Sequence, residues 1–315
     1  MSSNHLRVQK HHNITWIDIV NPTREQISQA MEGRALHPLH LDVSLLHEHL
    51  PQVEKEEDYV FLLLQLPDYD KAAQKVETKQ VAIFLAKNVL ITVHRGAISQ
   101  LQQLFDDCQQ NEDQCDNYFK GSSGHLLATI IGNLLKGSAE LIQSILVKLD
   151  KIEDVVFENH VAATYEIGQL RQHITKLKRL MDFLRDILAD LAPRIDEYTG
   201  EKLAHYYRHN ARIAQKQSML LEEARETIEI CKDADYTASN QKTNTILAIL
   251  TIIFTFTIPA TVVASFYGMN VPLPGGNQAG AWTFWGPYTT LIFVMILSVA
   301  PVLAMWWYFK KKKWF

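Results

Sequence analysis

Residues 246–266 constrain the fold more than any other stretch, because they contain no charged side chain. They read ILAILTIIFTFTIPATVVASF and are long enough to cross the roughly 30 Å hydrocarbon core of a bilayer as a helix. A second uncharged stretch, residues 287–309, ends in aromatic side chains of the kind that anchor helices at membrane interfaces. Each stretch contains an internal proline, Pro259 or Pro301, which neighbouring helices or a wet cavity accommodate. The sequence therefore predicts two transmembrane helices that pack together.

The orientation of these helices follows from the lysines and arginines around them. The connecting segment, residues 267–286, has neither, whereas Lys310, Lys311, Lys312 and Lys313 follow the second stretch at once. Basic residues are retained on the cytoplasmic side, so we expect a multi-pass protein of the cell (inner) membrane with both termini in the cytoplasm. The basic tail is expected to contact anionic lipids rather than a protein partner. A net charge of -4 gives no basic footprint for nucleic acid.

The part before the first span divides by pattern into two domains. Strand-like runs at residues 13–19 and 81–95, with a turn at Lys87 and Asn88, and helical spacing at 24–33 and 98–108 predict an α/β layer. After a predicted linker at 120–125, apolar residues recur at three- and four-residue spacing, which is typical of long packed helices. These residues are Leu134, Leu141, Ile145, Leu149, Ile152, Ile174, Leu177, Leu180, Leu184, Ile187 and Leu191.

Pro193 and Gly200 predict a break, after which one helix begins near Glu201 and meets no proline before Pro259. Such a helix could couple an internal sensor to a pore, or it could be a coiled-coil stalk that only assembles subunits. The predicted order is an α/β domain at residues 1–124, a long-helix stalk at 125–245, a membrane domain at 246–309 and a basic tail at 310–315. Within the membrane domain, the spans are 246–266 and 287–309.

The polar side chains of the first span converge on one helix face. At 100° per residue, five positions fall within about 80° of each other, and Thr261 lies at the edge of that face. The five are Asn244, Thr251, Thr255, Ile258 and Ser265. Polar groups in membrane helices usually face protein or water, which favours a conduction path. Alternatively, the hydroxyls only bond helix carbonyls or pack between helices.

The first span ends in Tyr267, Gly268, Met269 and Asn270, and this YGMN sequence resembles the signature of the CorA magnesium transporters. The resemblance extends to WIDIVNPTREQI at 16–27, LHPLHLD at 36–42 and FLAKNVLITVHRG at 84–96, so it covers essentially the whole chain. It implies a funnel-shaped homopentamer whose first spans line a pore and whose GMN motifs form a selectivity ring at the outer mouth.

In that family the transported ion is Mg²⁺, with Co²⁺ or Ni²⁺ as further substrates. Mg²⁺ holds its water shell tightly, so a ring of Asn270 amide oxygens would recognise the ion through its waters. Gly268 is expected to let the backbone turn where the helix ends. The resemblance also implies a polar constriction at Asn244 and apolar pore positions at Leu247, Leu250 and Ile258, where a hydrophobic ring would gate by dewetting.

Regulation follows from the same resemblance, because cytoplasmic Mg²⁺ held between subunits by acidic residues favours the closed state in this family. Asp233 and Asp235 are candidate ligands near the membrane end of the stalk, although a solvated helix face is the simpler role for any one acid. Mg²⁺ would thus be substrate and regulatory ligand, and we expect no cofactor. The absence of a phosphate-binding glycine loop or nucleophile elbow in the sequence argues against an enzyme.

Other readings remain open. The outer loop has no acidic residue to concentrate cations, and ZntB-like zinc transporters with the same fold often have such loops, so Zn²⁺ is the alternative substrate. A non-conducting, membrane-anchored metal sensor is the alternative from another class. A regulatory zinc site is conceivable at His37, His40, His47 and His49, or at His205 and His209, although structural roles are favoured. His11 and His12 are expected to be merely exposed.

Overall fold

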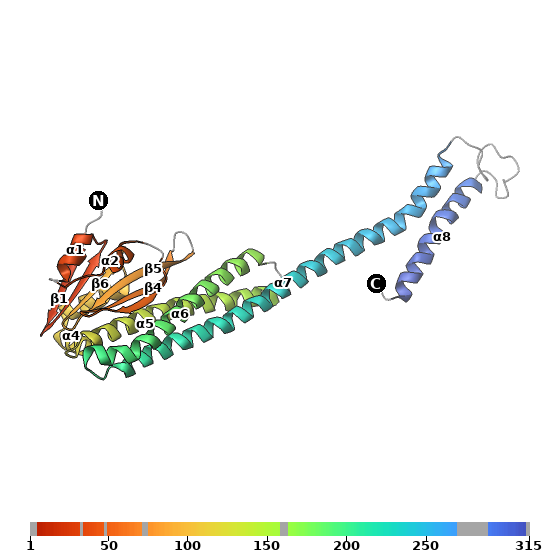
Figure 1. Cartoon of the computed structure of the whole chain (residues 1–315). Helices are drawn as coiled ribbons and strands as arrows, with labels where there is room; N and C mark the ends of the chain where they lie inside the picture. The colour runs from red at the N-terminus through yellow and green to blue at the C-terminus, as the bar shows by residue number, and fades with distance from the viewer. Residues whose placement is uncertain are drawn as a thin grey trace. The chain divides into compact units, whose positions relative to one another are not determined.

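The computed structural model describes residues 5–31, 34–46, 49–70, 75–157, 163–269 and 289–312. The chain divides into two compact units, Met1–Asp235 and Tyr236–Phe315. The first unit holds a sheet and long helices, and the second holds the end of one of those helices together with a final helix (Figure 1).

The described part of the first unit contains a six-stranded sheet in the order β1-β2-β6-β5-β4-β3. Its strands are β1 (His5–His11), β2 (Ile14–Val20), β3 (Gln52–Lys55), β4 (Val60–Asp70), β5 (Lys75–Leu85) and β6 (Val89–His94). Neighbouring strands are antiparallel, except that β2 and β6 are parallel. The predicted hairpin at Lys87 and Asn88 is confirmed, since Leu85 pairs with Leu90 across it.

Helices cover both faces of the sheet, as the alternation of buried side chains along β4 requires. Phe61 and Leu63 pack with Ile27 of α1 (Arg24–Ala30) and Leu41 of α2 (Pro38–Leu45). The opposite face, which carries Leu62 and Leu64, packs against four further helices (Figure 1). These are α3 (Ser99–Gln110), α4 (Glu112–Phe119), α5 (Ser123–Phe157) and α6 (Thr164–Thr199). The expected α/β layer is therefore confirmed.

The long helices α5, α6 and α7 (Ala204–Tyr267) are held in register by polar contacts. The Asn210 side chain donates to the Ala128 carbonyl at 2.8 Å and Gln217 donates to that of Leu135 at 2.9 Å, so α7 runs parallel to α5. Ion pairs from Lys178 to Glu222 at 3.4 Å and from Arg171 to Glu229 at 2.6 Å bring α6 against α7 in the opposite direction. The apolar positions predicted to pack face this core and are buried or partly buried.

The expected break at Pro193 is wrong, because Pro193 lies inside α6, which continues to Thr199. Leu191, Ala192 and Ile195 are all buried around it, and this packing outweighs the one backbone hydrogen bond that proline removes. The helix ends at Gly200, whose φ of 72° lies in the left-handed region that glycine adopts without strain. The predicted linker is also shorter than expected, since α5 begins at Ser123.

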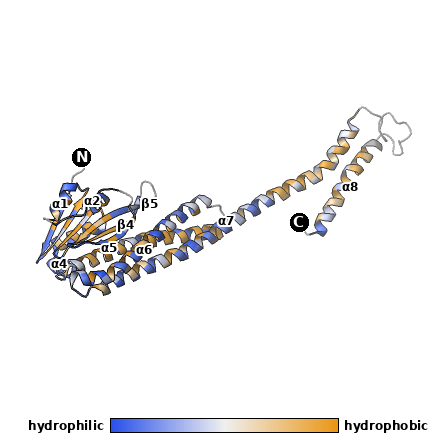
Figure 2. Cartoon of the chain, in the orientation of Figure 1, coloured by the Kyte–Doolittle hydropathy of each residue, from blue (hydrophilic) through white to orange (hydrophobic). Residues whose placement is uncertain are grey.

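Three described helices are long and apolar enough to cross a membrane: α5, α7 and Leu291–Lys311 of α8 (Thr289–Lys311). They differ in what their apolar side chains contact. In α5 these side chains pack into the core with α6, α7 and the sheet, whereas the apolar segments of α7 and α8 leave theirs exposed. Figure 2 shows the hydrophobic colour along the C-terminal part of α7 and along α8. Burial therefore explains the apolar character of α5 without a membrane.

A buried polar network joins the parallel strands β2 and β6. Thr92 donates to Asp18 at 2.6 Å, and His94 Nε2 lies 3.1 Å from the same carboxylate oxygen. Trp16 Nε1 donates to the Thr92 hydroxyl at 3.2 Å, so one carboxylate orients three side chains in the core.

Asp18→Ala is expected to destabilise the protein by about 3–5 kcal/mol, because removing one partner leaves the others buried and unpaired. The measurement is the Tm of the full-length protein in detergent. Asp42→Ala is the control, since the Asp42 ion pair with Arg24 is exposed and exposed pairs contribute about 1 kcal/mol or less. An equal, small change in Tm for both variants would contradict the role given to the network.

Candidate ion pathway

The predicted pore residues lie on α7, which runs as one helix to Tyr267. The expectation of a helix without a break before the first span is confirmed, and the helix also continues through Pro259. Proline has no N–H to donate to the carbonyl four residues earlier, which here belongs to Thr255. A backbone acceptor thus lies next to one of the predicted pore hydroxyls.

The threonine hydroxyls of this face donate hydrogen bonds to backbone carbonyls of the same helix. Thr251 donates to the Leu247 carbonyl at 2.7 Å, Thr255 to that of Thr251 at 2.6 Å, and Thr261 to that of Thr257 at 3.0 Å. A hydroxyl that donates a hydrogen bond can still accept another one through the lone pairs of its oxygen. Water bound to a cation points its hydrogens outward. The threonine oxygens can therefore accept hydrogen bonds from the water shell of a hydrated cation.

The apolar positions of the same segment are exposed within one chain. Leu247 is 55% exposed, Leu250 43% and Ile258 56%. The helical repeat places Leu247 and Ile258 within about 40° of the centre of the polar face and Leu250 about 100° from it. Leu247 and Ile258 therefore share the polar face, and Leu250 lies beside it.

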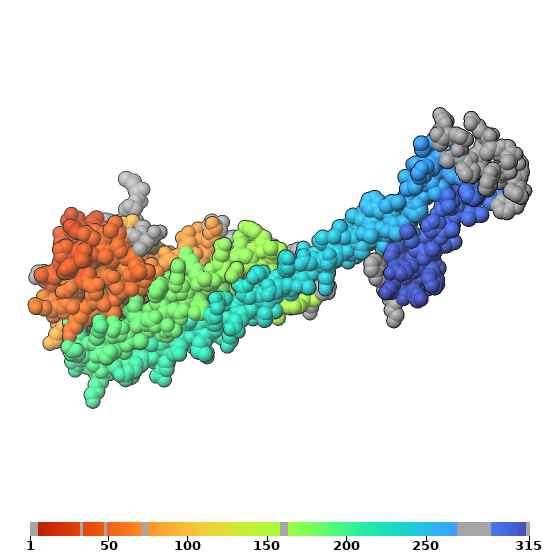
Figure 3. All heavy atoms as spheres, turned by 45° about the vertical axis from the view of Figure 1, so that its right-hand side comes forward, coloured from red at the N-terminus to blue at the C-terminus, as the bar shows by residue number. Residues whose placement is uncertain are grey.

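The two apolar helices contact each other inside the second unit. The rings of Phe256 on α7 and Phe309 on α8 meet edge to face with centroids 6.2 Å apart, and Val263 is buried. A cavity of about 530 Å³ lies between them, and both internal prolines, Pro259 and Pro301, line it. Figure 3 shows the end of α7 and α8 side by side. Both prolines therefore lie on the sides by which the two helices face each other, as the predicted pairing of the helices requires.

The end of α8 carries the features of a membrane interface. Lys310 Nζ lies 5.1 Å from the ring centroid of Trp306, and Lys311 Nζ lies 5.2 Å from that of Trp307. Aromatic rings beside lysines are typical of the boundary between hydrocarbon and water.

Of the GMN motif, the structure describes only Gly268 and Met269. The Gly268 N–H donates to the Ala264 carbonyl at 2.9 Å, and the Met269 N–H donates to that of Phe266 at 3.2 Å. The helix ends at Tyr267 and Gly268 lies in a turn, as expected, but its φ is not positive. Glycine is favoured instead by a close approach, since a Cβ there would lie 3.1 Å from the Ala264 oxygen. Asn270 lies outside the described residues.

The two acidic candidates occupy different environments. Asp235 is 7% exposed, and its oxygens accept from the Ala163 N–H at 3.0 Å and the Thr164 hydroxyl at 2.7 Å. It therefore caps the start of α6 from α7, a role that sequence reasoning missed because no local pattern links residues 72 positions apart. The Asp233 side chain is 80% exposed and lies 3.9 Å from Lys232 Nζ. As a metal ligand, Asp233 is the more accessible of the two.

The predicted histidine groups fall into separate environments. His37 caps α2, accepting from the Leu39 N–H, and His40 is buried with its ring nitrogens 2.8 Å from the Tyr59 hydroxyl and 2.8 Å from Glu54. Ligand atoms of His40, Glu54 and Glu56 lie within 4.8 Å of one another. His47 lies outside the described residues.

An α/β unit, long packed helices and two exposed apolar helices together define a class, that of helical membrane proteins with a large extramembrane domain. Residues 11–311 match the family described as CorA-like Mg²⁺ transporter protein, and the chain belongs to this family of membrane transporters.

Individual relatives agree with this assignment. The chain is 29% identical over 307 residues to the cobalt/magnesium transport protein CorA of Thermotoga maritima, covering 95% of this chain and 83% of the relative. It is 22% identical to the zinc transport protein ZntB of Yersinia pseudotuberculosis, covering 84% of this chain and 76% of the relative. The complete structure of the CorA magnesium transporter from Methanocaldococcus jannaschii matches with a TM-score of 0.78 at 20% identity, covering 96% of this chain and 92% of that one. This likeness shows the CorA fold.

Proposed function

We propose that this protein conducts divalent metal cations, with Mg²⁺ as the main substrate and Co²⁺ or Ni²⁺ as further ones, through a pore lined by α7. The observation that carries the proposal is the polar face of α7, whose hydroxyl oxygens keep their lone pairs available in the otherwise apolar segment 246–266 that leads to the GMN motif. The names of the CorA relatives support Mg²⁺ and Co²⁺.

A single chain cannot enclose a pore with one helix, and many side chains of its apolar segment outside the contact with α8 are exposed. Ile249, Ile253 and Phe254 are 52%, 53% and 60% exposed, and Leu247 and Ile258 on the polar face are 55% and 56% exposed. Such a segment needs lipid on one side and further copies of itself on the other. The homopentamer implied by the family resemblance meets this need, with α8 facing lipid and both termini in the cytoplasm.

Selection and gating are assigned to separate positions along the path. Gly268, Met269 and Asn270, with Tyr267, form the outer ring that recognises the hydrated ion. Asn244 forms the inner polar constriction, and Leu247 and Ile258 form apolar rings that close by dewetting. Metal bound between subunits near Asp233 would favour the closed state, and transport would follow the ion gradient and membrane potential.

A Zn²⁺ substrate is the second candidate, and a specific observation favours it. Residues 271–286 contain no acidic side chain to concentrate a strongly hydrated cation, and a ZntB zinc transport protein is among the relatives. Only a comparison of the two metals in transport separates these candidates.

The polar face is tested by Thr255→Val, which removes a hydroxyl with almost no change of shape. Losing one acceptor per subunit, worth about 1 kcal/mol, is expected to lower Mg²⁺ influx into proteoliposomes about fivefold or more. The control is Thr257→Val, because the Thr257 hydroxyl also bonds a helix carbonyl, that of Ile253, but lies about 140° from Asn244. Equal influx through both variants would contradict a pore lined by this face.

A further inference from the structure

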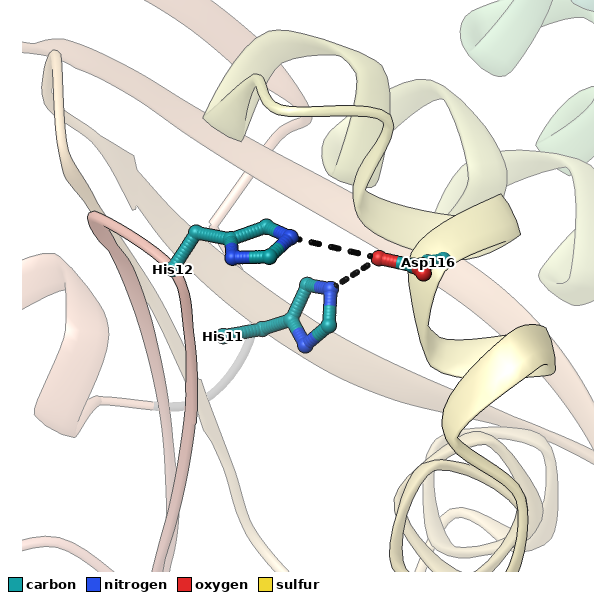
Figure 4. Close-up of side chains that lie close together, drawn as sticks. All are labelled: His11, His12 and Asp116. Atoms are coloured by element: carbon teal, nitrogen blue, oxygen red, sulfur yellow. Dashed lines mark hydrogen bonds and ion pairs between the residues drawn. The ribbon is translucent and has the colours of Figure 1, made fainter.

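His11, His12 and Asp116 form a cluster in the α/β unit that the ion pathway does not use (Figure 4). His11 Nε2 lies 2.5 Å from Asp116 Oδ1, and His12 Nε2 lies 3.3 Å from the same oxygen. One ligand atom from each residue lies within 4.8 Å of the other two. The expectation that both histidines are merely exposed is wrong for His11, whose side chain is 10% exposed.

The backbone at the β1–β2 turn makes this arrangement possible. Successive side chains of a strand point to opposite faces, so His11 and His12 would diverge if β1 continued. His12 instead has a φ of 48°, a left-handed conformation that is uncommon for a residue other than glycine. The turn brings the two rings onto the same side, with centroids 4.3 Å apart, and both face α4 (Figure 4).

The donor set fits a divalent transition metal better than Mg²⁺. Two imidazole nitrogens and one carboxylate oxygen suit Zn²⁺, Co²⁺ or Ni²⁺, whereas Mg²⁺ prefers oxygen ligands throughout. Two donors bound to a tetrahedral Zn²⁺ lie about 3.3 Å apart, as the His12 and Asp116 atoms do, and the shorter His11 contact would lengthen by about 0.8 Å.

We propose that His11, His12 and Asp116 bind a Zn²⁺-class transition-metal ion, with water completing the coordination, and that this ion fastens the edge of the sheet to α4. β1 is the terminal strand of the sheet, and α4 contacts it from a position more than 100 residues later in the chain. A metal shared between the turn and α4 would stabilise the folded edge, and this stabilisation would increase with the free metal concentration. This site lies outside the proposed transport function and does not depend on it.

The test uses metal-free, full-length protein in detergent, titrated with Zn²⁺ against a chromophoric chelator. We expect one tight Zn²⁺ per chain that millimolar Mg²⁺ does not displace, with affinity at least about tenfold weaker in both His12→Asn and Asp116→Asn. Asparagine tolerates the left-handed conformation at position 12, so His12→Asn removes the imidazole and keeps the turn. Asp106→Asn is the matched control, because Asp106 is an exposed aspartate on α3 that belongs neither to the cluster nor to the histidine groups considered above.

Two further readouts separate coordination from a simple ion pair. Co²⁺ bound to the wild type is expected to give the intense visible absorption of a tetrahedral site, and Zn²⁺ is expected to raise the Tm of the wild type and of Asp106→Asn but not of the two cluster variants. No tight Zn²⁺ in the wild type, unchanged affinity in either cluster variant, or an equal loss in Asp106→Asn would overturn the proposal.

Discussion

Asn270→Ala is expected to lower Mg²⁺ influx at least about 100-fold while leaving the assembled oligomer intact. In the proposed ring, each Asn270 amide oxygen accepts one hydrogen bond from the hydrated ion, worth about 1 kcal/mol. The substitution removes this hydrogen bond in every subunit, so the losses add up at the outer mouth. The methyl group of alanine accepts no hydrogen bond, so the ion would meet the outer mouth without a group that replaces bulk water.

The measurement is influx of Mg²⁺ into proteoliposomes with an internal dye, with size-exclusion chromatography of each variant to verify assembly. Asn117→Ala is a control for the loss of an asparagine, because Asn117 is exposed on α4 and lies outside the proposed ion pathway. Influx through Asn270→Ala at the wild-type rate would contradict the proposed selectivity ring.

Ile258→Thr is expected to raise Mg²⁺ influx about tenfold when the internal Mg²⁺ concentration is high. In the proposed pore, the Ile258 side chains of the subunits form a ring that excludes water when the pore is closed. The threonine hydroxyls would let water enter this ring. Each CH₂-sized group contributes about 0.8 kcal/mol to that exclusion, so a ring of several copies exceeds the 1.4 kcal/mol that corresponds to tenfold in rate.

The matched control is Ile253→Thr, the same substitution on the same helix. Ile253 is 53% exposed and Ile258 56% exposed, but Ile253 lies about 180° from Asn244 and Ile258 only about 40°. The same influx through Ile258→Thr and Ile253→Thr, or a lower influx through Ile258→Thr than through wild type, would count against a hydrophobic gate at this position.

Local patterns were sufficient for the elements that carry the proposed function. The absence of charge over residues 246–266 and the lack of proline between Pro193 and Pro259 predicted α7, and the β-branched runs around Lys87 predicted the β5–β6 hairpin. These features depend on composition and spacing within one segment, which the sequence states directly.

Features that depend on distant partners could not be predicted. Nothing in the sequence indicates that β2 pairs in parallel with β6, that Asp235 caps α6, or that Asp116 lies beside His11 and His12. Pro193 illustrates the converse, because a local rule predicted a helix end where packing on both sides keeps the helix intact. Tertiary contacts decided each of these cases.

The most direct test of the proposed function measures Mg²⁺ and Zn²⁺ influx side by side in proteoliposomes that hold the purified protein, with and without an imposed pH gradient. We expect Mg²⁺ entry driven by membrane potential and indifferent to the pH gradient. Zn²⁺ entry that protons stimulate, without Mg²⁺ entry, would contradict the account and assign the protein to zinc transport.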